Sequence, residues 1–291
     1  MTAPDGGRRR RATGSGAGWT VLEIVLSGSL LMLFVVPIVA LLTFAPPSEI
    51  ARVASEKGVE TSLLFTVYAS ALAVAVALVL GVPLGYVLAR RSFPGRSVVA
   101  SVVALPVMLP HLLVGLGFLL LTLPGTPVHA WAEAARLPLV GSITGVVLVM
   151  VFVSAPYTVL ASELSFRAVD PRLLEVSRSL GASRSSAFLT VTLPLAVRGI
   201  GAGLLLSWAR AVSEIGGLLV LAYTIYPSGA YQGPVTSPIS VYIYNLFELG
   251  NLKDAAAVSS LFLLIAFAVF LAVRLGERAG RLPWGRGELL P

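Results

Sequence analysis

Long hydrophobic runs without a charged residue dominate the pattern of this chain. A membrane-spanning helix needs about 20 mostly apolar residues, and each run is long enough to supply one. Proline and glycine interrupt the third run at Leu123-Pro-Gly-Thr-Pro127 and the fifth at Tyr226-Pro-Ser-Gly229. The runs are Ile24–Ser48, Thr61–Ala89, Ser97–Ala132, Leu137–Ser162, Ile215–Phe247 and Ala255–Val273.

These runs predict six membrane-spanning helices and therefore an all-α polytopic membrane protein. The fifth span is expected to begin upstream of its apolar run, so that Arg210 and Glu214 lie inside its helix. Prolines are expected to kink the helices that contain them, at Pro83, Pro106, Pro110 and Pro156. The predicted spans are roughly residues 21–44, 61–89, 98–122, 142–163, 198–224 and 254–275.

Composition places the chain in lipid and excludes several other classes. Charged residues make up 12% of the sequence, about half the share that a soluble domain needs to cover its surface. The net charge of +7 does not indicate a nucleic-acid partner, because the basic residues fall in short segments between apolar runs. Without cysteine there is no disulfide, iron–sulfur cluster or thiolate zinc site, and two histidines are too few for a histidine metal cage.

The distribution of basic residues predicts the orientation in the cell membrane. With the N-terminus inside, the inner segments hold sixteen lysines and arginines and the outer segments four. Inner loops carry the excess of positive charge, so both termini are predicted to be cytoplasmic. Residues 1–18 read as a flexible basic tail, and residues 19–60 as the first span and an outer loop. A secretory signal in residues 1–45 is the alternative, but no small-residue cleavage site follows it.

The longest predicted inner loop covers residues 166–198 and contains signals for two short helices. Asp170 can cap a helix whose first residue is Pro171. Gly181 suits the left-handed residue that ends such a helix, and Ser183 can cap a second one. The loop is therefore predicted to be a helix, a glycine turn and another helix that returns to the membrane.

The first of these helices has an apolar face. Leu173, Val176, Ser177 and Leu180 recur at helical spacing. Spacing alone leaves two interpretations open: an ordinary connecting helix at the lipid surface, or a helix that binds a partner.

Specific residues in this loop resemble a family motif. Glu175, Gly181, Val191, Leu193 and Pro194 have the spacing of the "EAA…G…I-LP" motif of permease subunits of ABC importers. The sequence departs from that motif at Val176, Ser177 and Val191. The resemblance to this permease core extends over about residues 60–275. It includes the segments Gly81-Val-Pro-Leu-Gly85, Phe93-Pro-Gly-Arg96 and Leu105-Pro-Val-Met-Leu-Pro110.

The resemblance implies a type I ABC importer permease with its core at residues 61–275 and a short cytoplasmic tail at residues 276–291. It implies a homodimer that binds ABC ATPase subunits on the cytoplasmic side and an extracytoplasmic solute-binding protein on the other. It also implies that the loop couples ATP binding to gate movement, through Asp170, Leu173, Glu175, Val176, Leu180 and Gly181. Glu175 could instead make only an internal cap or a salt bridge.

The nucleotide chemistry is expected on another chain. The sequence contains no Gly-x-x-x-x-Gly-Lys-Ser/Thr loop, so ATP and Mg²⁺ are expected on the partner ATPase. No catalytic residue, cofactor or metal site is predicted in this subunit, and it is not expected to be an enzyme.

Two ionisable residues in the fifth span are the other candidates for function. Ser207-Trp-Ala-Arg-Ala-Val-Ser-Glu-Ile-Gly-Gly217 resembles a "W-A-R-x-x-x-E-x-G" stretch of molybdate, tungstate and sulfate permeases. Arg210 and Glu214 can pair at their spacing of four. The pair either locks the fifth helix to a neighbour or belongs to the pathway. His111 is either an interior histidine with its hydrogen bonds satisfied or a residue that lines the pathway.

The outer loop at residues 225–252 is predicted to hold a short aromatic helix over residues 240–247. That helix could contact the binding protein or anchor the chain at the membrane interface.

Molybdate or tungstate is the first expectation for the substrate, and sulfate or another small solute is the alternative. A secondary transporter driven by an ion gradient is the rival class, but no inverted halves are evident in the sequence. A membrane-embedded enzyme would need polar catalytic groups within its spans, and only Arg210, Glu214 and His111 are candidates.

Overall fold

The computed structural model describes residues 16–278, and every regular element in this range is a helix. The all-α polytopic fold is therefore confirmed. Most of the two predicted tails, at residues 1–18 and 276–291, lies outside the described residues. The elements are α1 (Gly16–Phe44), α2 (Pro47–Ala54), α3 (Lys57–Arg90), α4 (Arg96–Met108), α5 (His111–Leu121), α6 (Pro127–Ala134), α7 (Ile143–Ala168), α8 (Pro171–Ser179), α9 (Arg184–Ala187), the π-helix η1 (Phe188–Thr192), α10 (Leu193–Val212), α11 (Gly216–Leu221), α12 (Ile239–Glu248) and α13 (Leu252–Arg278).

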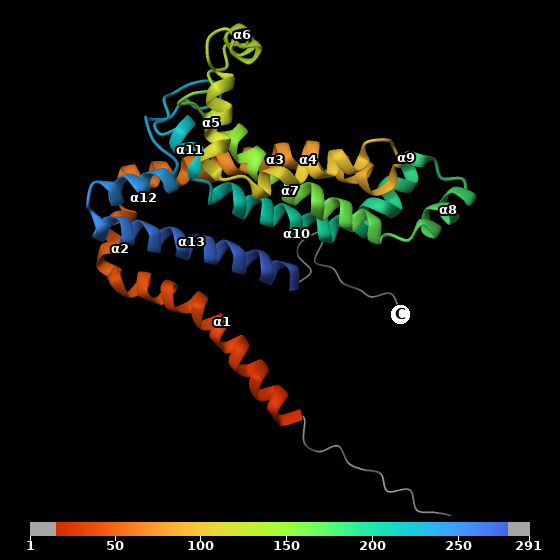
Figure 1. Ribbon diagram of the computed structural model, residues 1–291, viewed down its shortest axis with the longest axis horizontal. Coiled ribbons are helices and arrows are strands. Elements are labelled where there is room, and N and C mark those ends of the chain that lie inside the picture. The colour runs from red at the N-terminus through yellow and green to blue at the C-terminus, as the bar shows by residue number, and fades with distance from the viewer. Residues whose placement is uncertain (1–15, 279–291) are drawn as a thin grey trace, which may run out of the picture.

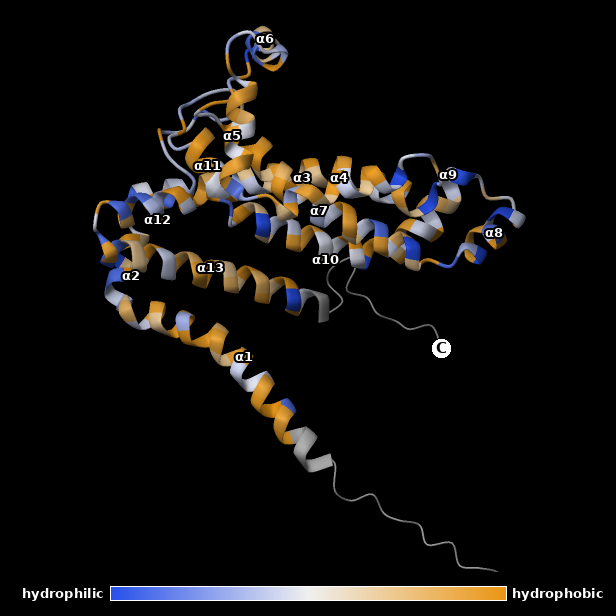
Figure 2. Cartoon of the chain, in the orientation of Figure 1, coloured by the Kyte–Doolittle hydropathy of each residue, from blue (hydrophilic) through white to orange (hydrophobic). Residues whose placement is uncertain are grey.

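Long apolar helices form a bundle whose two ends carry different short helices. α3, α7 and α10 pack against one another, and α13 packs mainly against α1, α2 and α12. α2 and α12 lie at one end of the bundle, and α8 and α9 lie at the other (Figure 1). Within residues 16–278, five helical stretches are long and apolar enough to cross a membrane, and the pair α4–α5 supplies a sixth candidate if it is one broken span. Figure 2 shows that hydrophobic residues predominate along these helices.

The third predicted span, 98–122, is not one helix. α4 and α5 meet at an angle of 111°, and α5 projects sideways from the bundle (Figure 1). The cause is Pro110, which cannot donate an amide hydrogen bond and which disfavours helical torsions at the residue before it. Leu109 accordingly has an extended conformation, with φ −74° and ψ 136°. Pro83, Pro106 and Pro156 lie inside helices that continue past them.

The fifth predicted span, 198–224, also needs correction. The helical stretch begins earlier, at Arg184, and passes through η1 into α10. It ends at Val212, and α11 starts again at Gly216. Glu214 therefore lies in a break between two helices and not inside one. Glycine is a poor helix former, and the pair Gly216 and Gly217 follows the break.

The most extensive helix–helix contact among the described residues is the one between α3 and α7, and at Gly85 it is also close. A Cβ atom on Gly85 would lie 2.6 Å from the Ser162 Cβ and 2.8 Å from the Val159 carbonyl oxygen. Small residues let helix backbones approach closely in membranes. The buried small residues of α3 continue this contact face along the helix, at Ala69, Ser70, Ala73, Ala77 and Gly81.

α1 stands apart from this core. None of its most hydrophobic 18-residue stretch is buried, and the helix extends away from the bundle (Figures 1 and 2). It contacts α13 near its C-terminal end, where the Ser260 hydroxyl donates to the Leu41 carbonyl at 3.3 Å. A helix with this surface requires lipid or another apolar partner around it.

Candidate functional site

The loop at residues 166–198, called the α8 loop below, has the predicted helix–turn–helix organisation. Asp170 caps α8, because its Oδ1 accepts the Arg172 amide at 2.9 Å. Gly181 has φ +92°, a conformation that costs glycine little. The Ser183 hydroxyl then caps α9 by accepting the Ser186 amide at 3.2 Å. Local capping chemistry thus places both helices.

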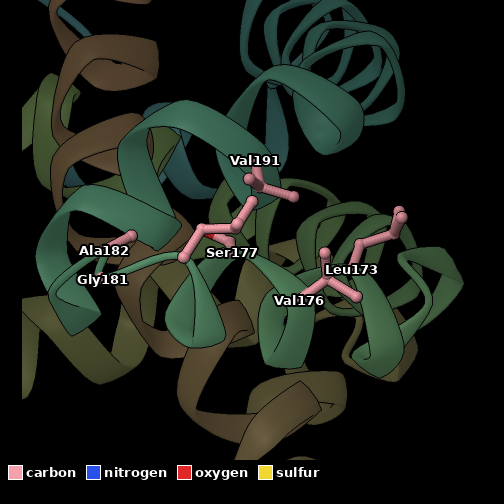
Figure 3. A pocket seen from close by; sticks show the side chains of 7 residues that line it. Leu173, Val176, Ser177, Gly181, Ala182 and Val191 are labelled. Carbon is pink, nitrogen blue, oxygen red and sulfur yellow. The ribbon is translucent and has the colours of Figure 1, made fainter.

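One face of α8 exposes apolar side chains. Leu173 is 47% exposed, Val176 58% and Leu180 84%. Together with residues of the turn and of η1 they line a shallow hollow of ≈ 580 Å³. Figure 3 shows this hollow, with Val191 of η1 beside Ser177 of α8. An exposed apolar face of this kind is a surface that a protein partner or a membrane could cover.

The neighbouring face of α8 is polar. Glu175, Arg178 and Ser179 line a second hollow of ≈ 480 Å³ with the glycine turn. Glu175 is exposed, and none of the ion pairs in residues 16–278 includes its carboxylate. Its main-chain carbonyl accepts the Ser179 hydroxyl at 3.0 Å. The Glu175 side chain is thus accessible beside the apolar face.

An aromatic cluster anchors the α8 loop to the bundle. Tyr86 of α3 meets Phe166 of α7 and Phe188 of η1 edge to face, with ring centroids 5.1 and 4.9 Å apart. Leu174, on the inner side of α8, packs against the same cluster. Such aromatic pairs contribute about 0.5–1.5 kcal/mol each beyond their buried area. The base of the loop is therefore fixed while the outer face of α8 stays open.

The second candidate site lies where the two broken helices meet. Arg210 Nη2 is 2.7 Å from Glu214 Oε2 and 2.8 Å from His111 Nε2. Glu214 Oε2 is also 3.6 Å from His111 Nδ1. The side chains are 15%, 0% and 44% exposed for arginine, glutamate and histidine respectively. The structure therefore joins a third residue, His111, to the two that the sequence singled out.

Glu214 holds four elements together. Its Oε1 accepts the Gly217 amide of α11 at 2.7 Å, and its main-chain carbonyl accepts the Ser240 hydroxyl of α12 at 2.6 Å. Its Oε2 binds Arg210 of α10 and approaches His111 of α5. A buried carboxylate is costly unless it is paired and hydrogen-bonded, and these contacts satisfy it.

The backbones of α5 and α11 approach closely beside this carboxylate. A Cβ on Gly216 would lie 2.6 Å from the His111 Cβ, and one on Gly115 would lie 2.5 Å from the Gly217 carbonyl oxygen. Larger side chains at these glycines would separate the two helices. The glycines therefore allow the helix breaks to meet at the charged cluster.

The aromatic helix predicted in the outer loop is α12. At its C-terminal end, the Tyr244 hydroxyl donates to Glu248 Oε1 at 2.5 Å, and this hydrogen bond raises the pKa of Tyr244. Phe247 is 62% exposed. Both properties suit a helix at an interface between water and lipid or between water and a partner.

Comparisons with known proteins agree with this architecture. The molybdate/tungstate transport system permease protein of Thermococcus kodakarensis is 38% identical over 211 residues, 72% of this chain and 74% of that protein. A probable molybdenum ABC transporter permease protein of Haloferax volcanii is 37% identical over 266 residues, 91% of this chain and 92% of that protein.

A solved bacterial alginate ABC transporter, in complex with an alginate pentasaccharide-bound periplasmic protein, has the same fold. Its TM-score is 0.61 at 17% identity, and the match covers 90% of this chain and 94% of that one. The family model described as "Binding-protein-dependent transport system inner membrane component" matches residues 81–281. The chain belongs to this family of inner membrane permease components.

Proposed function

We propose that this chain is the membrane subunit of an ATP-driven importer and that α8 docks into an ATPase subunit. The observation that carries the proposal is the open apolar face of α8, with Leu180 84% exposed at its end. Burying a leucine contributes about 1.5–3 kcal/mol, so a partner cleft that covers this face gains affinity. The accessible Glu175 beside it offers a polar contact that orients the docked helix.

The proposed assembly is a homodimer with ATPase subunits at the α8 end and a solute-binding protein at the α12 end. ATP and Mg²⁺ act on the ATPase subunits. When ATP closes the ATPase pair, the two docked α8 helices move together and the path opens outward. Two similarities support the arrangement: membership of a binding-protein-dependent family and a fold shared with a transporter solved with its periplasmic protein.

Molybdate or tungstate is the proposed cargo. The support is the function for which the relatives from Thermococcus kodakarensis and Haloferax volcanii are named, and these relatives are 38% and 37% identical. Sulfate is the second candidate, because it is also a tetrahedral dianion of similar chemistry.

For the charged cluster of His111, Arg210 and Glu214 we propose a structural role. The Arg210–Glu214 pair and its hydrogen bonds lock the broken end of α10 to α11 and α12. Because Glu214 already compensates Arg210, the arginine carries little net positive charge toward an anion. The pair would therefore hold the helices that surround the path instead of binding the cargo.

Uptake in proteoliposomes tests the function. The subunit would be reconstituted with its ATPase and binding protein, and radiolabelled molybdate, tungstate and sulfate would be compared. We expect uptake of molybdate or tungstate that requires ATP on the side of the membrane where the ATPase subunits are bound. Uptake that needs only an ion gradient would contradict the class, and preference for sulfate would reject the cargo while keeping the class.

A variant on the open face tests the docking. Leu180→Asp should abolish ATPase association, with affinity at least about tenfold lower, because each 1.4 kcal/mol is a factor of ten. The melting temperature of the subunit should not change, since Leu180 is exposed. Ser185→Asp, at an exposed position on α9, is the matched control. Retained ATPase binding in Leu180→Asp would show that α8 is not the docking element.

A further inference from the structure

Arg90, the last residue of α3, contacts the joint between α7 and α8. Its Nη2 donates to the main-chain carbonyl of Val169 at 2.6 Å, across 79 positions of sequence. Val169 is the C-terminal cap of α7 and is buried. Asp170, the next residue, is the N-terminal cap of α8. The arginine thus binds the chain at the point where it leaves one helix for the other.

The geometry of this joint makes the bond effective. Val169 (φ −73°, ψ 120°) and Asp170 (φ −60°, ψ 122°) are the two extended residues between the helices. A peptide unit is planar, so fixing the Val169 carbonyl also fixes the peptide plane that leads into Asp170. The direction in which α8 leaves α7 depends on that plane.

Apart from the Arg90 bond, α8 is held mainly by contacts with the segments that follow it in the chain. Its principal contacts are with α9 and η1, which belong to the same loop. The bond from Arg90 instead joins the start of α8 to α3, and α3 is fixed against α7 by the close contact at Gly85. The bond therefore fixes the start of α8 relative to α3 and α7, the helix pair with the most extensive contact in the described bundle.

Arg90 differs from Arg96 and Arg167 in binding a main-chain carbonyl and not a carboxylate. The carboxylate of Glu163 pairs with Arg167 and, at 3.6 Å, with Arg96, whereas Arg90 binds a main-chain carbonyl. The Arg90 Nε is buried without a hydrogen-bond partner. A cation needed only for its charge near the membrane surface would remain solvated, as exposed Arg91 does.

We propose that Arg90 is a positioning residue for α8, setting the direction in which the helix is presented to the ATPase. The link to transport rests on the proposed docking role of α8, but the positional effect does not. A charge-assisted hydrogen bond to a helix-terminal carbonyl suits this task, since it is directional and favoured by the helix dipole.

Spin-label distances can measure the position directly, because the chain has no cysteine of its own. Labels on Ser92→Cys and Arg172→Cys, both at exposed positions and outside the two hollows of α8, would report the separation of the α3 end from α8. The assembled transporter would contain one labelled copy per dimer, obtained by dilution with unlabelled subunits. Uptake per ATP hydrolysed would be measured on the same variants.

We expect Arg90→Met to broaden the distance distribution and to lower uptake per ATP about fivefold, the effect of losing one hydrogen bond. Arg90→Lys retains a donor and should restore a narrower distribution. Arg91→Met removes the same charge and should behave as the unsubstituted protein. An unchanged distribution in Arg90→Met overturns the positioning role, and so does equal broadening in Arg91→Met. If Arg90→Met does not insert, Arg90→Gln replaces it, because the shorter glutamine keeps the site polar but does not reach as far as the arginine. A distance distribution in Arg90→Gln as narrow as that of the unsubstituted protein then decides against the positioning role.

The same data separate this inference from the proposed function. A broadened distribution with normal uptake per ATP supports the positioning role and contradicts coupling through α8. Loss of ATPase binding in Leu180→Asp tests the docking without involving Arg90.

Discussion

Arg210 and Glu214 form an ion pair across the C-terminal end of α10, with 2.7 Å between Nη2 and Oε2. Because the glutamate is fully buried and the arginine nearly so, neither can lose its partner without leaving a charge in a medium of low dielectric constant. Removing one member of such a pair typically costs about 3–5 kcal/mol.

Single substitutions of this pair should therefore be destabilising. Arg210→Met and Glu214→Ala are each expected to lower the melting temperature and the uptake. The double variant Arg210→Met with Glu214→Gln removes both charges, and the glutamine oxygen can still accept the Gly217 amide. It should recover most of the stability and much of the uptake. Recovered stability with uptake still lost would place one of the two residues in the transport pathway instead.

Substitutions of Gly181 should be unfavourable because of its backbone conformation and not because of side-chain volume. A Cβ there meets nothing within 4 Å, but the φ of +92° is unfavourable for other residues, by roughly 1–2 kcal/mol. Gly181→Ala should thus weaken transport moderately, and Gly181→Pro, whose φ is fixed near −65°, should abolish it in an inserted protein.

Gly95 provides the control for this glycine. It has φ +84° and equally open surroundings, but it begins α4 and not the α8 loop. Gly95→Ala should carry a similar strain with little effect on ATPase association. Equal loss of ATPase binding in the two alanine variants would mean that the Gly181 turn has no special part in docking.

Substitutions of Gly85 should instead be unfavourable because of side-chain volume. An alanine Cβ would lie 2.6 Å from the Ser162 Cβ and 3.0 Å from the Glu163 amide nitrogen, and main-chain atoms cannot move aside cheaply. Gly85→Ala is expected to lower the free energy of unfolding by about 1–3 kcal/mol. Gly117→Ala, also in a helix but with open space around it, should cause no loss. Thermal melts in detergent would compare them, and equal melting temperatures would disprove the close α3–α7 contact.

Labelling can test the orientation predicted from the charge distribution. Single cysteines at Ser55, after α2, and at Ser179, in α8, would both be exposed at opposite ends of the bundle (Figure 1). In intact cells an impermeant maleimide should react at residue 55 and not at residue 179. The reverse pattern would invert the topology and place the α8 loop outside.

Features that depend on neighbouring residues could be predicted from the sequence. Continuous apolar runs located the spans at residues 21–44, 61–89, 142–163 and 254–275. Asp170, Pro171 and Gly181 located α8 and its turn. In each case the deciding chemistry, a cap or a left-handed residue, is contained within a few positions.

Features that depend on distant contacts could not be predicted in this way. The hydrogen bond between Arg210 and His111 joins residues 99 positions apart. Nothing in the local pattern distinguishes Arg90, which binds Val169, from exposed Arg91. Pro110 signalled a kink, but the 111° turn at that residue also requires α11 to receive α5 through paired glycines. The end of α10 before Glu214 likewise depends on bonds to α11 and α12.

The small residues at the α3–α7 contact have a consequence for the entropy of folding. Apolar burial gives helices little reason to associate in a bilayer, because lipid tails are as apolar as leucine. Glycine and alanine lose no rotamer freedom when they are buried, whereas long side chains lose up to about 2 kcal/mol each. The glycines and alanines that α3 contributes to its pairing with α7 therefore lose no side-chain torsional freedom, which lowers the entropic cost of the contact. α1, with its leucines and other large side chains facing outward, keeps that rotational freedom in the lipid.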